Sequence, residues 1–112
     1  MTQSAEFGAT VSQGTRAAQP DLVVYRLRSD QTGDPGPRIG LVVSKAVGNA
    51  VQRHRVSRQL RHAARAVIGE LHPSDRVVIR ALPGSRGALT RRLEQELRTA
   101  LDRIRVRSGV VQ

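Results

Sequence analysis

The apolar side chains of this chain recur with two different periods, and these periods predict helices and strands in a definite order. Helices are predicted over residues 4–13, 50–68 and 88–106, where apolar positions follow helical spacing. Strands are predicted over residues 15–18, 21–29, 38–44 and 76–82, between turn-forming residues. The order α-β-β-β-α-β-α indicates a single α+β domain over residues 1–112, with helices packed against one mixed sheet.

The connections between these elements favour a particular strand arrangement. Residues 30–37 are dense in Gly, Pro and Asp, so we expect them to join two antiparallel strands. The strand-helix-strand unit over residues 38–82 is expected to pair its strands in parallel, with the right-handed crossover that most such units have. Glu94 and Arg98 should form an ion pair on the last helix. Five apolar residues of that helix are expected to face the core: Leu89, Leu93, Leu97, Leu101 and Ile104.

The predicted central helix, residues 50–68, has two opposite faces. At about 100° per residue, one narrow stripe is apolar and consists of Val56, Leu60, Ala63 and Val67. The opposite side is basic and consists of His54, Arg58, Arg61 and Arg65, flanked by Arg55 and His62. We therefore expect the helix to dock by its apolar side and to present a cationic ridge.

The charge of the chain indicates the class of its partner. With a formal net charge of +10 on 112 residues and a pI near 11.8, the protein attracts polyanions, of which nucleic acid is the usual one. The sequence has no cysteine, which excludes disulfides and cysteine-ligated zinc. It has neither the roughly eighteen consecutive apolar residues of a membrane span nor the apolar segment of a signal peptide. We therefore expect a cytoplasmic protein.

Within this charge, the segment over residues 35–69 is distinctive because it holds basic residues and no acidic one. Its basic residues are Arg38, Lys45, Arg53, Arg55, Arg58, Arg61 and Arg65. A helix face that serves solubility alone usually mixes both signs, as the final helix does with three acidic residues among its arginines. Like charges on one face destabilise a helix unless an anion neutralises them. Nucleic-acid contact is therefore favoured over a merely solvated face, and the helix start at Gly48-Asn49 offers backbone N–H groups to a phosphate.

No constellation of catalytic side chains is visible. The acidic residues are scattered, and no acidic residue lies between His54 and His62. His72 lies in a turn before Pro73. We therefore expect neither a catalytic residue nor a metal held by this chain. The two aromatic residues, Phe7 and Tyr25, are by periodicity alone more typical of a core than of base stacking.

The segment over residues 40–51, GLVVSKAVGNAV, continues into a run of basic residues at Arg53, His54, Arg55, Arg58 and Arg61. This segment resembles the RNR signature of the bacterial ribonuclease P protein component, in which a strand, a glycine-asparagine break and a basic helix follow one another. Further likeness at residues 4–7, 22–25 and 75–81 extends the resemblance over nearly the whole chain. It implies that family's fold, a sandwich like domain 2 of ribosomal protein S5, with a β-α-β crossover that is left-handed.

The resemblance also implies a function. In that family the RNA subunit and its bound Mg2+ ions carry out catalysis, and the protein helps the RNA to remove the 5′ leader of precursor tRNA. The implied partners are the ribonuclease P RNA and precursor tRNA, with no membrane. We expect a monomeric free protein and one copy per RNA.

Carried over residue by residue, the resemblance assigns two surfaces. The surface that contacts the RNA subunit comprises Lys45, Asn49, Arg53, His54, Arg55, Arg58 and Arg61, and Arg65 extends it by helical geometry alone. A cleft between the sheet and the first helix, which in the family holds the single-stranded leader, maps to Phe7, Val11 and Tyr25. The resemblance thus favours exposed aromatics that stack on or abut bases.

The chain departs from the family motif at three positions. Ala46, His54 and Ser57 replace a lysine, an asparagine and a basic residue. His54 can still donate a hydrogen bond to a phosphate or a base, but its charge depends on pH. We expect a weaker electrostatic grip at these positions. Residues 1–6 contain no cation, whereas the family tends to have a short basic arm there.

Other classes of protein share parts of this pattern. A non-catalytic basic ribosomal or ribosome-assembly protein that binds RNA is the main alternative. A helix-turn-helix regulator of DNA would need two short adjacent helices, which the pattern does not predict. An independent nuclease would need carboxylates clustered around a metal, and the carboxylates of this sequence are dispersed.

Overall fold

The computed structural model describes residues 4–28 and 36–107 and contains helices and strands in the predicted order. They are α1 (Ser4–Gln13), β1 (Thr15–Ala18), β2 (Leu22–Arg28), β3 (Arg38–Val42), α2 (Ala50–Val67), the 3-10 turn η1 (Ile68–Glu70), β4 (Asp75–Ala81), the 3-10 turn η2 (Pro83–Gly87) and α3 (Thr90–Arg107). The ends of the helices and strands lie within two residues of the predicted ones. The predicted α+β class is therefore confirmed.

The strands form one mixed sheet in the order β1-β2-β4-β3. β2 is antiparallel to both β1 and β4, whereas β3 and β4 run parallel. The parallel pair, with α2 between its strands in sequence, confirms the expected β-α-β unit. β2 and β3 run in opposite directions, as the turn-rich segment between them predicts, but β4 lies between them.

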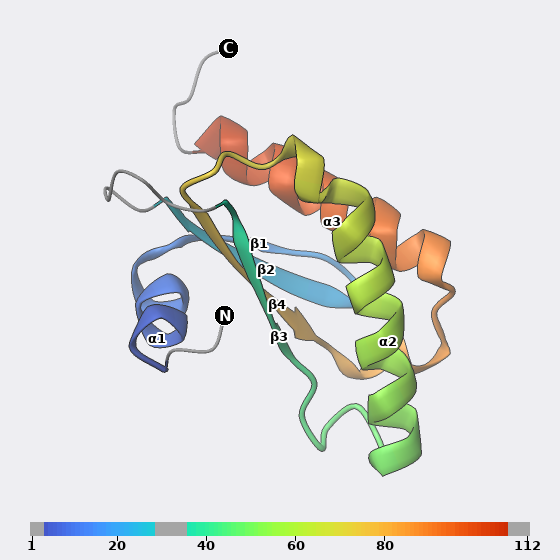
Figure 1. Ribbon diagram of the computed structural model, residues 1–112. Helices are drawn as coiled ribbons and strands as arrows, with labels where there is room; N and C mark the ends of the chain where they lie inside the picture. The colour runs from blue at the N-terminus through green and yellow to red at the C-terminus, as the bar shows by residue number, and fades with distance from the viewer. Residues whose placement is uncertain (1–3, 29–35, 108–112) are drawn as a thin grey trace.

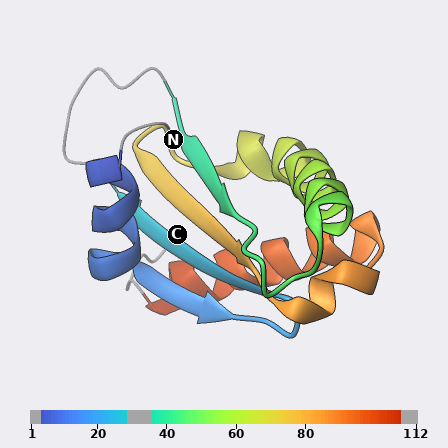
Figure 2. The same cartoon turned by 90° about the horizontal axis from the view of Figure 1, so that it is seen from below.

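The two faces of the sheet are covered unequally (Figures 1 and 2). α2 and α3 pack side by side over one face, and α1 lies on the other, against β2 and β4. We call the face on the α1 side the open face. The main core lies between the sheet and the helix pair and includes Leu22, Val24, Val77 and Ile79 from the strands with Leu60, Leu93, Leu97 and Ile104 from the helices.

α2 docks on the sheet by the stripe that its sequence predicts. Val56, Leu60 and Ala63 are fully buried, and Val67 is 1% exposed. α3 docks on the sheet in the same way, because Leu93, Leu97, Leu101 and Ile104 are buried. Leu89 is the exception: it precedes the first residue of α3 and is 67% exposed. Leu89 keeps the four-residue spacing of the buried leucines, and Leu93 N donates a 3.1 Å hydrogen bond to Leu89 O. It nevertheless stands before the first helical residue and its side chain faces solvent, so the prediction that Leu89 faces the core is wrong.

The start of α2 is fixed by a reciprocal cap. Asn49 Oδ1 accepts a hydrogen bond from Gln52 N, and Gln52 Oε1 accepts one from Asn49 N, each at 2.9 Å. This capping box satisfies two N–H groups that the first turn of a helix otherwise leaves open. It sets the point at which the chain leaves the turn after β3 and enters the basic helix.

Candidate RNA-binding surfaces

The outer side of α2 is a continuous basic surface, as predicted. His54, Arg58, Arg61 and Arg65 are all exposed, on the side opposite the buried stripe. We call these four residues the α2 ridge. Arg55 and His62, on its flank, are also exposed. At 1.5 Å per residue the ridge runs for roughly 16 Å along the helix, which is long enough to contact several phosphates.

No acidic side chain of the described segments pairs with the α2 ridge. The ion pairs on the surface of α3 make the contrast clear, since Arg98 bonds to Glu94 and Glu70. The predicted Glu94–Arg98 pair is thereby confirmed, at 3.3 Å. On α2 the nearest neighbours of each arginine on the outer side are other cations or neutral residues. The ridge therefore has its full charge available for a polyanion.

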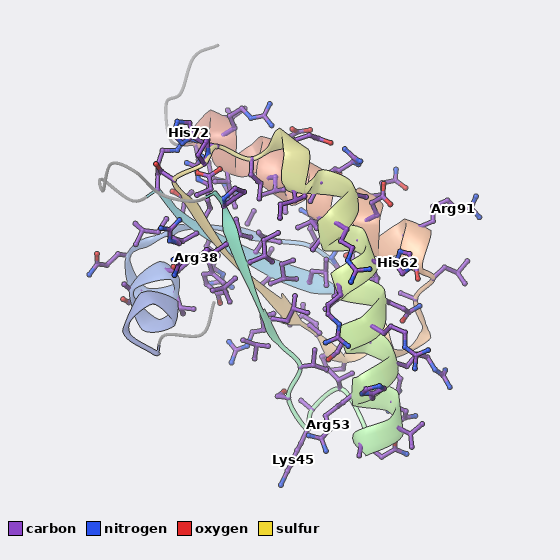
Figure 3. All side chains as sticks on the ribbon, viewed as in Figure 1. Arg38, Lys45, Arg53, His62, His72 and Arg91 are labelled. Carbon is purple, nitrogen blue, oxygen red and sulfur yellow. The ribbon has the colours of Figure 1, made fainter. Side chains whose placement is uncertain are left out.

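The turn before α2 adds further groups beside the ridge. Lys45 is exposed and extends from this turn, away from the sheet (Figure 3). Asn49 uses its side-chain oxygen to cap the helix, so its amide NH2 is the part that can still donate. Val51 is 71% exposed and lines a shallow hollow with His54, Arg55 and Arg58. This corner combines cations with an apolar contact surface.

Arg53 differs from the ridge residues. It is half-buried, and at 100° per residue it lies about 50° from the centre of the apolar stripe. Its Nε is buried and has no hydrogen-bond partner within the described residues. A buried guanidinium N–H costs free energy until it is satisfied. Arg53 is therefore placed at the edge of α2 near the turn, and it is not part of the ridge.

The open face carries the residues assigned to the leader cleft, and Tyr25 is not placed as expected. Tyr25 is only 8% exposed and packs with Val23 and Val78. The expectation of an exposed aromatic is wrong for Tyr25, because the neighbouring strands and α1 surround it. Val11 is 38% exposed on α1. The side chain of Phe7 lies outside the described residues.

Two arginines on the open face were not identified from the sequence. Arg16 pairs with Tyr25 across β1 and β2, and Arg80 pairs with Val23 across β4 and β2. Directly opposite residues share a face of the sheet, so both arginines flank the buried aromatic, and both are exposed. The alternation of apolar Val78 and basic Arg80 along β4 is the sequence signal that could have assigned Arg80 to the same face as Val78. The open face therefore has an apolar centre with exposed arginines beside it, Arg16 on the edge strand β1 and Arg80 on the inner strand β4.

Within residues 4–28 and 36–107 no three histidine or acidic side chains gather in a way that would hold a metal ion. No helix in this part of the chain is long and apolar enough to cross a membrane.

Comparison with known proteins identifies the family. The family model described as Ribonuclease P matches residues 1–105. The chain belongs to the ribonuclease P protein family. The ribonuclease P protein component of Mycolicibacterium vanbaalenii is 82% identical over 97% of this chain and 92% of that protein. That of Mycolicibacterium gilvum is 74% identical over 96% of this chain and 87% of that protein.

A solved structure shows that the fold is shared. The Staphylococcus aureus RNase P protein superposes with a TM-score of 0.76 at 24% sequence identity, covering 91% of each chain. The chain is thus a component of ribonuclease P, an endoribonuclease of tRNA processing whose protein component binds RNA. A basic ribosomal or ribosome-assembly protein, the main alternative from the sequence, is not favoured.

Proposed function

We propose that this chain binds the catalytic RNA subunit of a bacterial ribonuclease P through the α2 ridge and the turn before it. The observation that carries the proposal is the uncompensated charge of the ridge, where four exposed basic residues follow one side of a helix. Arginine suits this role because its planar fork bonds two phosphate oxygens at once. The proposed contacts are Lys45, Asn49, Arg53, His54, Arg55, Arg58, Arg61 and Arg65.

These contacts divide into two kinds. The ridge arginines contribute electrostatic attraction along the RNA backbone, which positions the protein without reading sequence. Asn49 and Arg53 act at the helix start, where the Asn49 NH2 and the Arg53 guanidinium would donate to the RNA. The capping box uses the amides of Asn49 and Gln52, so those of Ala50 and Val51 are the ones aimed outward at a phosphate.

The 5′ leader of precursor tRNA is proposed to lie along the open face. Its phosphates would contact Arg16 on β1 and Arg80 on β4, and its bases would lie over the apolar centre formed by Tyr25 and Val23. Phe7 and Val11 on α1 form the proposed second wall of this cleft. Because Tyr25 is only 8% exposed, its ring does not offer a full stacking surface to a base.

Mg2+ is proposed to act on the RNA side of the complex, bound mainly by the RNA subunit and the substrate. The two proposed surfaces of this chain are cationic, so their residues do not fit a magnesium site, which needs oxygen ligands. Their arginines instead neutralise phosphates, which otherwise recruit cations from solution. The protein is therefore expected to lower the Mg2+ concentration that leader removal requires.

The remaining features of the proposed assembly follow from charge. We propose a monomeric free protein, because a net charge of +10 on 112 residues opposes self-association. One copy then binds one RNA subunit in the cytoplasm.

The proposed function is tested by reconstitution. The purified chain is mixed with a bacterial ribonuclease P RNA and a precursor tRNA at a Mg2+ concentration where the RNA alone cleaves slowly. We expect the protein to accelerate release of the 5′ leader. Cleavage no faster than with RNA alone, at protein concentrations that saturate RNA binding, would overturn the proposal.

A further inference from the structure

The hollow on the outer side of α2 has a chemistry that contacts with phosphates alone do not require. It lies over the first turns of the helix, on the side opposite the buried stripe, and has a volume of about 550 Å³. That volume is within the range of sites for small molecules. We call it the α2 hollow, and it is lined by Ala50, Val51, His54, Arg55 and Arg58.

Val51 is the largest apolar residue of the α2 hollow. It is 71% exposed and belongs to neither hydrophobic cluster of the described residues. The cap of the helix does not need its side chain, because Asn49 and Gln52 complete that cap between them. A single exposed valine is common on protein surfaces, so its meaning depends on the side chains that surround it.

A ring and two guanidinium planes surround Val51. His54 and Arg55 follow it by three and four residues and so neighbour it on the helix surface, and Arg58 lies one turn further on. Imidazole rings and guanidinium planes are groups on which proteins stack unpaired bases. His54 replaces the asparagine of the family motif, so this chain places a ring where the motif has an amide. The α2 hollow therefore matches the flat, partly apolar face of a base.

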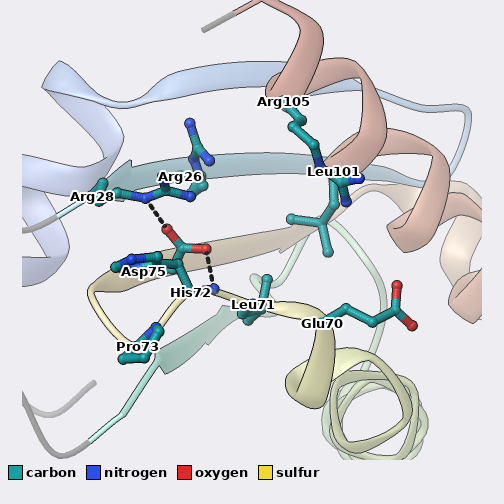
Figure 4. A pocket seen from close by; sticks show the side chains of 9 residues that line it. All are labelled: Arg26, Arg28, Glu70, Leu71, His72, Pro73, Asp75, Leu101 and Arg105. Atoms are coloured by element: carbon teal, nitrogen blue, oxygen red, sulfur yellow. Dashed lines mark hydrogen bonds and ion pairs between the residues drawn. The ribbon is translucent and has the colours of Figure 1, made fainter. Parts of the chain in front are cut away.

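The residues that line the α2 hollow include no carboxylate, which restricts the occupant further. The pocket where β2 ends and β4 begins is different, because Glu70 and Asp75 are among the residues that line it (Figure 4). In that pocket Asp75 Oδ1 lies 3.0 Å from Arg28 Nε, so charge is compensated within the chain. The α2 hollow instead suits a molecule that joins an aromatic plane to negative charge, as a nucleotide does.

We propose that the α2 hollow binds one unpaired base of the RNA subunit. The base lies against Val51 and stacks on His54, while Arg55 and Arg58 hold the phosphates beside that nucleotide. This inference rests on the proposed function and deepens it, because it adds a contact with a base to the contacts of the α2 ridge with the RNA backbone. A base inside a duplex stays paired and stacked, whereas an unpaired nucleotide can turn its base toward the protein. The α2 hollow thus selects an unpaired segment of the RNA over a duplex.

Methyl NMR of the full chain detects a bound base directly. A base stacked over a methyl group shifts the methyl proton signal upfield through its ring current, which a phosphate does not do. The probes are a short oligoadenylate strand and a blunt-ended RNA duplex with the same number of phosphates. We expect the strand to shift the Val51 methyl signals upfield in a saturable way and the duplex to leave them nearly in place.

Val106 is the matched control for this titration. It is 78% exposed on α3, beside Arg103 and Arg107, and so combines an exposed valine with nearby cations. Its methyl signals should stay in place with either probe. Val51 signals that do not move with the strand, or that move equally with the duplex, would overturn the proposal.

Variants test the same contact on the RNA subunit itself. Val51→Ser removes the apolar contact and no charge, so it should weaken binding of the ribonuclease P RNA about fivefold. The slope of log K against log salt should not change, because no phosphate contact is lost. Val106→Ser should match the parent chain. His54→Asn should weaken binding by a similar factor, whereas His62→Asn, at an exposed histidine outside the α2 hollow, should not.

The outcomes separate a failure of this inference from a failure of the proposed function. If the parent chain does not bind the ribonuclease P RNA, both are wrong. If Arg61→Ala with Arg65→Ala weakens binding while Val51→Ser and Val106→Ser both match the parent, the α2 ridge holds the RNA and the α2 hollow takes no base. A loss in Val51→Ser that comes with a shallower salt slope would show disturbed phosphate contacts and would equally contradict a bound base.

Discussion

Gly48 lies directly against the side chain of Gln52, so a Cβ on Gly48 would overlap Gln52 Oε1. Gly48 also has a φ of 156°, a backbone conformation that side chains rarely adopt. Gln52 Oε1 is the atom that accepts from Asn49 N in the capping box. The glycine-asparagine break of the motif is therefore a structural requirement of the helix start, quite apart from any contact with RNA.

Gly48→Ala should consequently destabilise the protein. Strain at φ and displacement of Gln52 together should lower the free energy of unfolding by about 2–3 kcal/mol. Urea unfolding followed by circular dichroism measures this. Gly69→Ala is the control, because a Cβ there meets nothing within 4 Å. Equal losses in the two variants would contradict the role assigned to Gly48.

The docking of α2 should depend on its apolar stripe. Leu60 is fully buried in the main core, so Leu60→Ala should cost about 2–5 kcal/mol of unfolding free energy. Leu89→Ala removes the same atoms from a side chain that is 67% exposed, and it should change stability by no more than about 0.5 kcal/mol. A small effect of Leu60→Ala in the same unfolding measurement would show that α2 is held by other contacts.

The leader cleft should depend on Tyr25. Tyr25→Leu keeps an apolar side chain between Val23 and Val78, so the fold should persist. It should lower the affinity for precursor tRNA about fivefold, equivalent to about 1 kcal/mol, and leave the affinity for mature tRNA unchanged. Arg80→Ala should act in the same direction through lost phosphate attraction. If both variants keep the parent's ratio of precursor tRNA affinity to mature tRNA affinity, the open face does not bind the leader.

A buried pair of carboxylates, Asp21 just before β2 and Glu96 on α3, joins the start of β2 to α3. Glu96 Oε1 accepts a 2.9 Å hydrogen bond from Asp21 N, and Arg92 Nε lies 3.0 Å from Asp21 Oδ2 and 3.2 Å from Glu96 Oε2. Glu96 is 7% exposed. Burial, followed by the bond to the Asp21 side chain, raises the pKa of Glu96 above its ordinary value. In the folded state Glu96 thus holds its proton to a higher pH than in the unfolded state.

This shift makes stability depend on pH in a defined direction. A carboxyl with a raised pKa favours folding fully below its unfolded pKa, and that contribution is lost as pH rises through the folded pKa. Glu96→Gln cannot ionise, so its unfolding free energy minus that of the parent chain should increase from pH 4 to pH 7. The carboxylates that do not contact Glu96 are common to both proteins and cancel in the difference. A difference that stays constant or falls would contradict the raised pKa.

The two faces of α2 could be predicted from the sequence, while the environment of Tyr25 could not. The period of a helix is local, so Val56 and Arg58 are assigned to opposite sides by counting alone. The burial of Tyr25 depends on Val78, which pairs with it from β4. The insertion of β4 between β2 and β3 is equally a long-range event that no turn signal encodes.

The packing of α3 against the end of β2 was also beyond the sequence pattern. Arg26 and Arg105 are far apart in the chain and line one pocket only because α3 packs over β2. Neither arginine belongs to a motif, and from the sequence each is indistinguishable from an ordinary surface cation. Asp75 in turn reads as a turn residue, although it is 2% exposed and holds Arg28.

The central claim, that the α2 ridge binds the RNA subunit, is tested most directly by a charge-matched comparison. Arg58→Ala with Arg61→Ala removes two cations from the ridge, and Arg91→Ala with Arg103→Ala removes two exposed cations from α3. Affinity for the ribonuclease P RNA is measured over a range of salt concentrations. The parent chain, neutralising roughly six phosphates, should give a slope of log K against log salt of about −4 to −5. The ridge variant should bind at least about tenfold more weakly, with a slope shallower by roughly 1.4–1.8, and the α3 variant should match the parent. Equal losses in the two variants would contradict the claim.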